Sequence, residues 1–364
     1  MGPKVEQSCF LTDVTIQEIV NILNLLHADK APGDDAITNK ILKLAGLSIA
    51  YPLCILFNKF FMFSQVPKAL KTSKVIPVFK NNSKTDVSNY RPISLLTGIS
   101  KLFERVIATR MRAFIEQNDI LCKEQHGFRT GYSTSSALIT LTDNIYKAMN
   151  DGYFFASLFI DLSKAFDFID HDILLKELEH YGFRGKIGKL LESYLMDRTF
   201  YTTIGDIKSG VCNIKNGVPQ GSVLGPLLFS LFINDLPNAL AYCGSIIYAD
   251  DTTLYNRNAM QQDLIAEMQH DFNTIQMWFK SNYLKVNEAK TKFVIFGTPG
   301  KLRQIDASTC NMRINNNIIQ RTKEVTYLGV IVDESLTWIL HVKYVAKKMS
   351  WATTYLVPFK IKKR

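Results

Sequence analysis

Hydrophobic and polar positions follow two periods along this chain, one typical of helices and the other of strands. Apolar residues that recur every three or four positions predict helices at 12–26, 38–47, 49–71, 102–117, 133–150, 170–181, 227–233 and 261–282. Short apolar runs bounded by turn residues predict strands at 74–80, 90–94, 157–161, 200–204, 246–247, 252–255, 292–296 and 325–332. The mixture, without an internal repeat or a low-complexity linker, predicts an α+β fold with a central sheet surrounded by helices.

One predicted hairpin has two adjacent carboxylates at its tip. Tyr248-Ala249-Asp250-Asp251 lies between the apolar run Ile246-Ile247 and the β-prone run that starts at Thr252. Like charges repel at this spacing, and a divalent cation neutralises them; hard oxygen ligands suit magnesium. The pair alone is weak evidence, because acidic residues are common in turns.

A third acid makes a metal site a stronger interpretation than an ordinary acidic turn. Ser157 to Ile160 is another apolar strand, and it ends on Asp161. Two strands that deliver three acids to one point are what a two-metal phosphoryl-transfer site needs. We therefore predict that Asp161 and Asp250 bridge two Mg²⁺ ions, for which Mn²⁺ is a substitute, and that Asp251 assists them.

The charge of the chain is uneven. Lys and Arg outnumber Asp and Glu by 43 to 33, which gives a net charge of +10 over 364 residues. Residues 68–110 hold nine basic and two acidic side chains, and residues 341–364 hold seven basic and none acidic. A single basic run is often only a solvated face, but two runs that flank an acidic centre favour a polyanionic partner such as nucleic acid.

Other features exclude several classes of protein. The six cysteines are scattered without a Cys-x-x-Cys pair, which argues against a structural zinc site and a disulfide scaffold. The N-terminus lacks the layout of a signal peptide. The longest apolar stretch, Ala50 to Phe63, is interrupted by Asn58 and Lys59 and is too short to span a bilayer. These observations indicate a soluble intracellular protein without a membrane partner.

Cationic side chains for a triphosphate are expected in the hairpin of strands 74–80 and 90–94. Arg91 is the first candidate, because a guanidinium binds phosphate with two hydrogen bonds, and Lys80 is the second. The alternative for both is a surface residue that serves solubility.

Two further positions are candidates for contacts with a nucleotide. The glycines on either side of Gln220, Gly217 and Gly221, allow the backbone of a helix-entry loop to approach a base or a sugar. Phe166, five residues after Asp161, has a ring that could pack beneath a sugar and clash with a 2′-hydroxyl. An ordinary loop and a core phenylalanine are the alternatives.

Seven segments, taken in chain order, resemble the reverse transcriptase of non-LTR (LINE-type) retrotransposons, close to the jockey-like elements. They are Asn89–Leu96 (NYRPISLL), Gln125–Arg129 (QHGFR), Phe159–Asp167 (FIDLSKAFD), Gly217–Pro226 (GVPQGSVLGP), Tyr248–Asp251 (YADD), Asn287–Thr291 (NEAKT) and Tyr327–Gly329 (YLG). Each segment alone is modest evidence. With a turn near residue 32, they extend over about residues 28–340 in the order of the family.

The resemblance implies a right-hand polymerase that copies RNA into DNA. Its parts would be an N-terminal helical extension with the start of the fingers (1–70), fingers (71–150), a palm (151–335) and the start of a truncated thumb (336–364). Its partners would be an RNA template, a DNA primer and deoxynucleoside triphosphates, in the nucleus or else the cytoplasm. The oligomeric state is not implied.

The family also implies roles for individual residues. The three aspartates would bind metal, Arg91 the triphosphate, and Gln220 with Gly221 the nucleotide, while Phe166 would be the sugar gate. Two sites follow only from the resemblance. Lys290 would give a proton to the departing pyrophosphate, and Tyr327-Leu328-Gly329 would grip the primer end.

Departures from the family keep a second hypothesis open. Pro32-Gly33-Asp34-Asp35-Ala36 replaces the usual Pro-Gly-Pro-Asp-Gly turn, and no endonuclease domain or Cys/His knuckle is present. About thirty-five residues follow Gly329, too few for a full thumb, so we expect one domain of a larger protein or a truncated copy. The alternative function is therefore a weakly active or inactive remnant that binds RNA or an RNA–DNA hybrid. A metal-dependent nuclease would leave Arg91 and the Gln220 loop unexplained.

Overall fold

The computed structural model describes residues 4–80, 83–306, 309–315 and 317–356. It divides into two compact units, each assembled from separate stretches of the chain. The first comprises Met1–Lys123, Lys164–Asp235 and Ser281–Leu284, and the second comprises Glu124–Ser163, Leu236–Lys280 and Lys285–Arg364. Asn81 and Asn82 of the predicted loop, and the basic residues after 356, lie outside the described residues.

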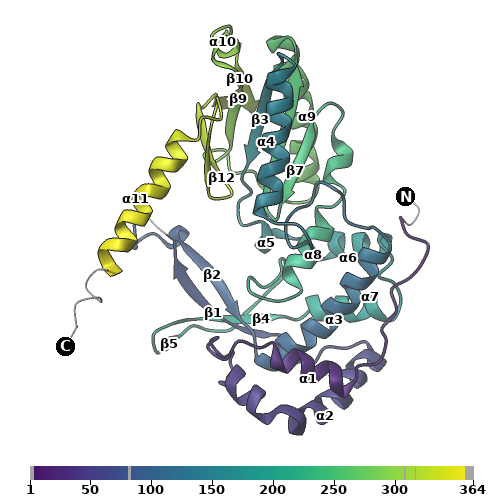
Figure 1. The fold of residues 1–364 in the computed structure, drawn as a ribbon. Coiled ribbons are helices and arrows are strands. Elements are labelled where there is room, and N and C mark those ends of the chain that lie inside the picture. Colours follow the sequence, from purple (N-terminus) through teal and green to yellow (C-terminus); the bar gives the residue numbers. More distant parts are fainter. Residues whose placement is uncertain (1–3, 81–82, 307–308, 316, 357–364) are drawn as a thin grey trace, which may run out of the picture. The chain divides into compact units, whose positions relative to one another are not determined.

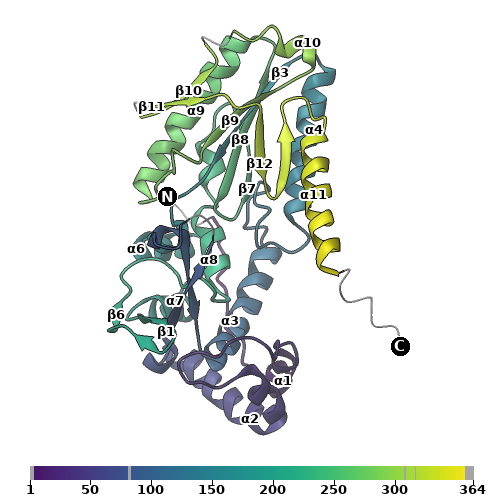
Figure 2. The ribbon, with the colours of Figure 1, turned by 90° about the vertical axis from the view of Figure 1, so that its left-hand side faces the viewer.

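The second unit is built on a four-stranded antiparallel sheet. Its strands are β3 (Phe154–Ile160), β7 (Gly244–Tyr248), β8 (Asp251–Asn258) and β9 (Lys292–Phe296), in the order β7-β8-β3-β9. All seven residues of β3 are buried, because α4 (Thr134–Asn150) covers one face of the sheet and α9 (Gln261–Ser281) the other (Figures 1 and 2). The predicted central sheet that carries the acidic strands is therefore confirmed.

Two hairpins and a C-terminal helix complete this unit. The hairpins pair β10 (Asn311–Ile314) with β11 (Asn317–Gln320), and β12 (Glu324–Tyr327) with β13 (Val330–Asp333). Val325, Tyr327 and Val332 of the second hairpin share a buried cluster with α4, β3 and β9. A short helix, α10 (Pro299–Leu302), follows β9, and α11 (Ile339–Leu356) follows the hairpins.

The first unit combines a second sheet with helices. The β1 (Thr72–Phe79) and β2 (Tyr90–Leu95) hairpin forms in the predicted place, and β1 also pairs in parallel with β4 (Thr199–Ile204). The short strands β5 (Ile207–Lys208) and β6 (Cys212–Asn213) each pair antiparallel with β4. The helices of this unit are α1 (Ile16–Asn24), α2 (Asn39–Phe63), α3 (Gly98–Gln117), α5 (Ala165–Phe168), α6 (His171–His180), α7 (Lys186–Leu195) and α8 (Gly225–Phe232). Mixed helices and mainly antiparallel sheets confirm the α+β class.

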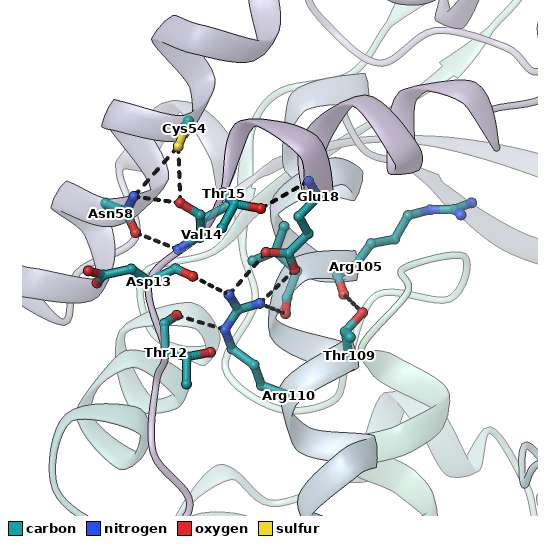
Figure 3. Close-up of polar contacts among 11 residues, drawn as sticks. Thr12, Asp13, Val14, Thr15, Glu18, Cys54, Asn58, Arg105, Thr109 and Arg110 are labelled. Carbon is teal, nitrogen blue, oxygen red and sulfur yellow. Dashed lines mark hydrogen bonds and ion pairs between the residues drawn. The ribbon is translucent and has the colours of Figure 1, made fainter.

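The first helix starts later than its sequence pattern predicts. Thr15, and not Thr12 or Asp13, caps α1 by accepting from Glu18 N at 3.1 Å. The carbonyls of Thr12 and Asp13 instead accept from the Arg110 guanidinium, at 2.9 and 3.1 Å (Figure 3). Arg110 also pairs with Glu18 at 2.7 Å, so α3 holds the chain extended until Thr15.

Helix α2 is long and apolar enough to cross a membrane by length and composition alone. It extends over 25 residues, beyond the interrupted apolar stretch seen in the sequence, and is kinked at Gly46. One such helix is weak evidence for a span, since core helices of globular proteins pass the same test. Val14 N donates to Asn58 of α2, and Cys54 and Asn58 donate to the Val14 carbonyl (Figure 3).

Candidate active site

The pairing of β3 with β8 brings two predicted acids to the same end of the sheet. Ile160 pairs with Thr252 in the antiparallel register. Asp161, which follows Ile160, therefore lies at the same end of the strand pair as Asp251, which precedes Thr252. Asn287 N donates to the Asp161 carbonyl at 2.8 Å, which holds the chain at the point where β3 ends. Acids about ninety positions apart in sequence therefore meet, as the sequence predicts.

The charges at this end of the sheet repel one another. Burial raises the pKa of Asp251 to about 6, and the nearby charges of Asp250 and Asp161 act in the same direction. Lys290 acts in the opposite direction, and its Nζ lies 3.5 Å from Asp161 Oδ2. The lysine whose role was implied only by the family resemblance thus lies beside the acids.

The hairpin turn that carries Asp250 has a strained backbone. Tyr248 pairs with Asp251, so Ala249 and Asp250 form the two-residue turn between β7 and β8. Ala249 has a φ of +57°, a region where a non-glycine residue costs about 1–2 kcal/mol. Its side chain is buried, and the surrounding protein must therefore hold the turn in this shape.

A cavity of about 620 Å³ opens beside the acids. Asp161, Asp251 and Lys290 line it, together with residues of β8, β9, β12 and β13. Tyr327 and Leu328, two of the three residues predicted to grip a primer, also line it. The ring of Tyr327 is buried 5.1 Å from that of Phe159, so it anchors the β12–β13 hairpin to the sheet.

The tip of that hairpin is the predicted primer-grip turn. Leu328 and Gly329 have φ values of +46° and +86° and connect Tyr327 to its partner Val330. Two positive φ values suit a tight two-residue hairpin, in which glycine is free of strain and leucine is not. The structure thus fixes the geometry of this turn, while its role toward a primer stays a prediction.

The three aspartates have the donor chemistry for magnesium but do not already surround a metal position. Among the residues that the structure describes, no three His, Cys, Asp or Glu side chains form a group that could hold a metal ion. The contact of Lys290 with Asp161 is weak, because 64% of the lysine side chain is exposed, and a divalent cation can displace it. Oxygen ligands and mutual repulsion fit a hard cation here, and the metal-binding role of the aspartates stays a prediction.

The residues predicted to bind a nucleotide belong to the first unit. Arg91 is exposed on β2, and Lys80 directly follows β1. Lys80 N donates to the carbonyl of Asn89, the residue before β2, at 2.8 Å. The Gln220 carbonyl accepts from Ser94 N of the same strand at 2.8 Å. A Cβ at Gly221 would lie 2.9 Å from the Ser94 carbonyl oxygen, so the loop docks on the strand that carries Arg91.

Phe166 is partly buried and stacks on Phe229 of α8, with ring centroids 4.6 Å apart. Its carbonyl accepts from Val218 N at 2.9 Å, which ties α5 to the glycine loop before Gln220. Gly217, with a φ of +84°, has no room for a Cβ, because the carbonyl oxygens of Phe166 and Asp167 would lie at 2.7 Å. The glycine, the ring and Gln220 therefore belong to one packed loop structure.

A comparison with protein families agrees with these segments. Residues 80–332 match the family described as "Reverse transcriptase (RNA-dependent DNA polymerase)", which covers more than two thirds of the chain. The chain belongs to this reverse transcriptase family. The resemblance deduced from seven short segments is therefore confirmed.

Several relatives of the chain are proteins of Drosophila mobile elements. The chain is 32% identical over 352 residues to "Probable RNA-directed DNA polymerase from transposon BS" of Drosophila melanogaster, covering 94% of this chain and 38% of that protein. Two proteins named "RNA-directed DNA polymerase from mobile element jockey" are similar as well. The one from Drosophila melanogaster is 28% identical (95% of this chain, 39% of the relative) and the one from Drosophila funebris 31% (90% and 36%). The chain thus spans less than two fifths of each relative.

Asp167 is a neighbour of Gln220 that the sequence pattern did not single out. Its Oδ1 accepts from Gln220 Nε2 at 2.9 Å and fixes which way the predicted nucleotide-contacting amide points. Burial raises the pKa of Asp167, while the Gln220 hydrogen bond and the charges of Lys164 and Lys80 lower it. Its place in the segment Phe159–Asp167 is the one signal that could have found it.

Glu104 is a second residue that sequence reasoning missed. It is fully buried in α3, and its Oε2 accepts from Val223 N at 2.5 Å and from Leu224 N at 3.4 Å. Oε1 accepts from the Tyr194 hydroxyl at 2.9 Å, and the buried Arg198 provides the compensating charge. This carboxylate fixes the start of α8, directly after the Gln220 loop.

Proposed function

We propose that this chain is the catalytic core of an RNA-directed DNA polymerase of a non-LTR retrotransposon. It adds deoxynucleotides to the 3′-hydroxyl of a primer annealed to RNA. The observation that carries this proposal is the meeting of Asp161 with the Asp250-Asp251 hairpin at one end of the β3–β8 pair, in a chain of the reverse transcriptase family.

In this proposal the three aspartates hold two Mg²⁺ ions. If bound there, the ions would supply the positive charge that lowers the pKa of the primer hydroxyl and stabilises the leaving pyrophosphate. The protein brings the carboxylates together and partly buries them, so that their ionised forms are unfavourable without a cation. The raised pKa of Asp251 supports this role. Lys290, exposed and 3.5 Å from Asp161, is suited to give a proton to pyrophosphate.

The residues of the first unit serve the incoming nucleotide in this proposal. Arg91 and Lys80 bind the triphosphate as cations on the β1–β2 hairpin. Gln220, oriented by Asp167, and Gly221 lie at the base or the sugar, and Phe166 excludes a 2′-hydroxyl. The ring of Phe166 is braced by Phe229, as a steric gate requires, since a mobile ring would yield to the extra oxygen.

We further propose a right-hand arrangement of these parts. The four-stranded sheet is the palm, the β1–β2 hairpin belongs to the fingers, and α11 begins the thumb. Helix α11 exposes Lys343, Lys347 and Lys348, which suit the phosphates of a primer–template duplex.

A primer-extension assay with poly(A)/oligo(dT), dTTP and Mg²⁺ tests this proposal. We expect the wild type to extend the primer and Asp250→Ala to lose at least about a thousandfold in rate, as the loss of about 4 kcal/mol of transition-state stabilisation implies. Asp263→Asn, on an exposed carboxylate of α9, is the matched control and should extend normally.

Binding separates the two hypotheses left by the sequence. Fluorescence anisotropy with a labelled RNA–DNA hybrid should give the same Kd for the wild type and Asp250→Ala. A wild type that binds the hybrid but never extends it would identify the chain as a binding remnant. Normal extension by Asp250→Ala would show that the site assignment is wrong.

A further inference from the structure

A short segment outside the sheet lies along the strand that leads into the aspartate hairpin. Ile247 N donates to the Glu124 carbonyl at 2.8 Å, and His126 N donates to the Ile247 carbonyl at 2.7 Å. Gln125 thereby forms a parallel bridge with Ile247, on the edge of β7 that does not face β8. The bridge ends one residue before Tyr248, where the turn begins.

Gly127 brings this segment against the turn itself. A Cβ at this position would lie 2.3 Å from Ala249 N and 3.1 Å from the Tyr248 carbonyl carbon. Both atoms are main chain, so no flexible side chain can move aside to admit a methyl group. The backbone of residue 127 is therefore packed against the Tyr248–Ala249 peptide, which leads into the turn.

The glycine is needed here for space and not for conformation. The φ of Gly127 lies outside the left-handed region, so a positive φ is not what requires a glycine here. A loop glycine with no further role would be free to carry a Cβ. The contact with Ala249 is therefore the physical reason for a glycine at this position.

The segment is itself firmly held. Gln125 is fully buried, and its Oε1 accepts from Gly127 N at 2.7 Å. His126 Nδ1 lies 2.8 Å from Ser136 Oγ, and its ring meets that of Tyr132 edge to face at 5.0 Å. Ser136 belongs to the capping box at the start of α4, so the rigid helix that covers the sheet anchors the segment.

We propose that the segment Gln125–Gly127 is a positioning element that holds the Ala249-Asp250-Asp251 turn in place for nucleotide addition. Gly127 acts as a positioning residue, through the turn and without contact with substrate. The strained φ of Ala249 needs such a support, because an unsupported turn would relax and carry Asp250 with it. This proposal rests on the proposed function, since it gives the position of Asp250 a catalytic meaning.

Gly127→Ala tests the proposal, and Gly300→Ala is its matched control. Gly300 lies in the same unit and has no positive φ, and a Cβ added there would have no atom within 4 Å. In primer extension we expect Gly127→Ala to lower kcat about a hundredfold, the cost of a misplacement of about 1 Å. The KM for dTTP and the Kd for a labelled RNA–DNA hybrid should change less than about threefold, and Gly300→Ala should match the wild type.

Hydrogen exchange gives a readout that does not depend on activity. The amides of Tyr248–Thr252 should exchange at least about tenfold faster in Gly127→Ala than in Gly300→Ala, as expected if about 1.4 kcal/mol of local stability is lost. If the wild type extends no primer, the proposed function fails, and this exchange comparison still decides whether the segment holds the turn.

Ser136→Ala covers the case in which Gly127→Ala does not fold. It removes the hydroxyl next to His126 and keeps the Ser133 side chain that caps α4. We expect a severalfold lower kcat and faster exchange at Tyr248–Thr252. Wild-type kcat and wild-type exchange at the turn, in Gly127→Ala or in this replacement variant, would overturn the proposal.

Discussion

Removal of the charge of Asp251 should stabilise the metal-free protein while it destroys the activity. Burial and the charges of Asp250 and Asp161 raise the pKa of this carboxyl from 3.8 to about 6. A shift of about two pKa units corresponds to about 3 kcal/mol against the ionised form in the folded state. Asp251→Asn has nearly the same size and no charge, so at about pH 7.5 we expect it to raise the free energy of unfolding by about 2–3 kcal/mol.

The dependence on pH has a definite sign. In the unfolded chain the pKa of Asp251 lies near its ordinary value, whereas in the folded chain the carboxyl stays protonated up to about pH 6. The stability that it contributes is therefore fully present below about pH 4 and is lost as the pH rises through 6. The difference between Asp251→Asn and the wild type should be small at about pH 4 and complete at about pH 7.

Urea unfolding followed by circular dichroism, in EDTA and at about pH 4 and pH 7.5, measures this difference. Asp263→Asn is the control, because its carboxylate is exposed in the first turn of α9 and its loss removes only a helix-dipole interaction of about 0.5 kcal/mol. Mg²⁺ should stabilise the wild type at the higher pH and Asp251→Asn much less. The reasoning is refuted if Asp251→Asn is no more stable than the wild type at the higher pH. It is also refuted if the difference in the free energy of unfolding is the same at both pH values.

Three further variants probe the first unit. Glu104→Ala should lower the free energy of unfolding, measured in urea, by about 3–5 kcal/mol, because Arg198 is left buried without its counter-charge. The control Glu116→Ala, at an exposed position of the same helix, should change it by less than about 0.5 kcal/mol. Phe166→Ala should raise the kcat/KM for UTP relative to dTTP on poly(A) about tenfold, the effect of about 1.4 kcal/mol of lost steric exclusion; an unchanged ratio removes the ring from this role. Asp167→Ala should raise the KM for dTTP about tenfold, because Gln220 loses a hydrogen bond to a charged acceptor, and an unchanged KM contradicts its positioning role.

Local patterns were sufficient for most elements of the fold, but not for their long-range pairing. The apolar run Lys292–Phe296 is the strand β9 at the predicted bounds, and the β1–β2 hairpin forms as predicted. The parallel pairing of β1 with β4, which joins Thr72 to Thr199, has no local signal. The cap of α1 was wrong for a similar reason, since Arg110, ninety-eight residues from Thr12, takes the carbonyls that precede it.

In the candidate site, too, residues with a local sequence signal were predictable and residues that act through long-range contacts were not. A carboxylate directly after a buried strand is visible in the sequence, so Asp161 and the Asp250-Asp251 hairpin could be found. Gly127 and Glu104 act on main-chain atoms more than a hundred residues away, at Ala249 and Val223. No periodicity marks such contacts, and in a sequence Gly127 is indistinguishable from an ordinary turn residue.

The contacts of Asp161 constrain its main chain more than its carboxylate, and this supports the proposal that the site is prepared for a cation. Asn287 N donates to the carbonyl of Asp161, β8 of the hairpin pairs with β7 on one side and with β3 on the other, and Gly127 packs against the turn. Among the residues that the structure describes, the carboxylate of Asp161 forms an ion pair with the exposed Lys290 at 3.5 Å, a contact worth less than about 1 kcal/mol. A slip of one residue in the β3–β8 register would turn Asp251 to the other face of the sheet. In the proposed mechanism the fold therefore contributes mainly by keeping this register, so that little rearrangement of the main chain would be needed for a metal to bind.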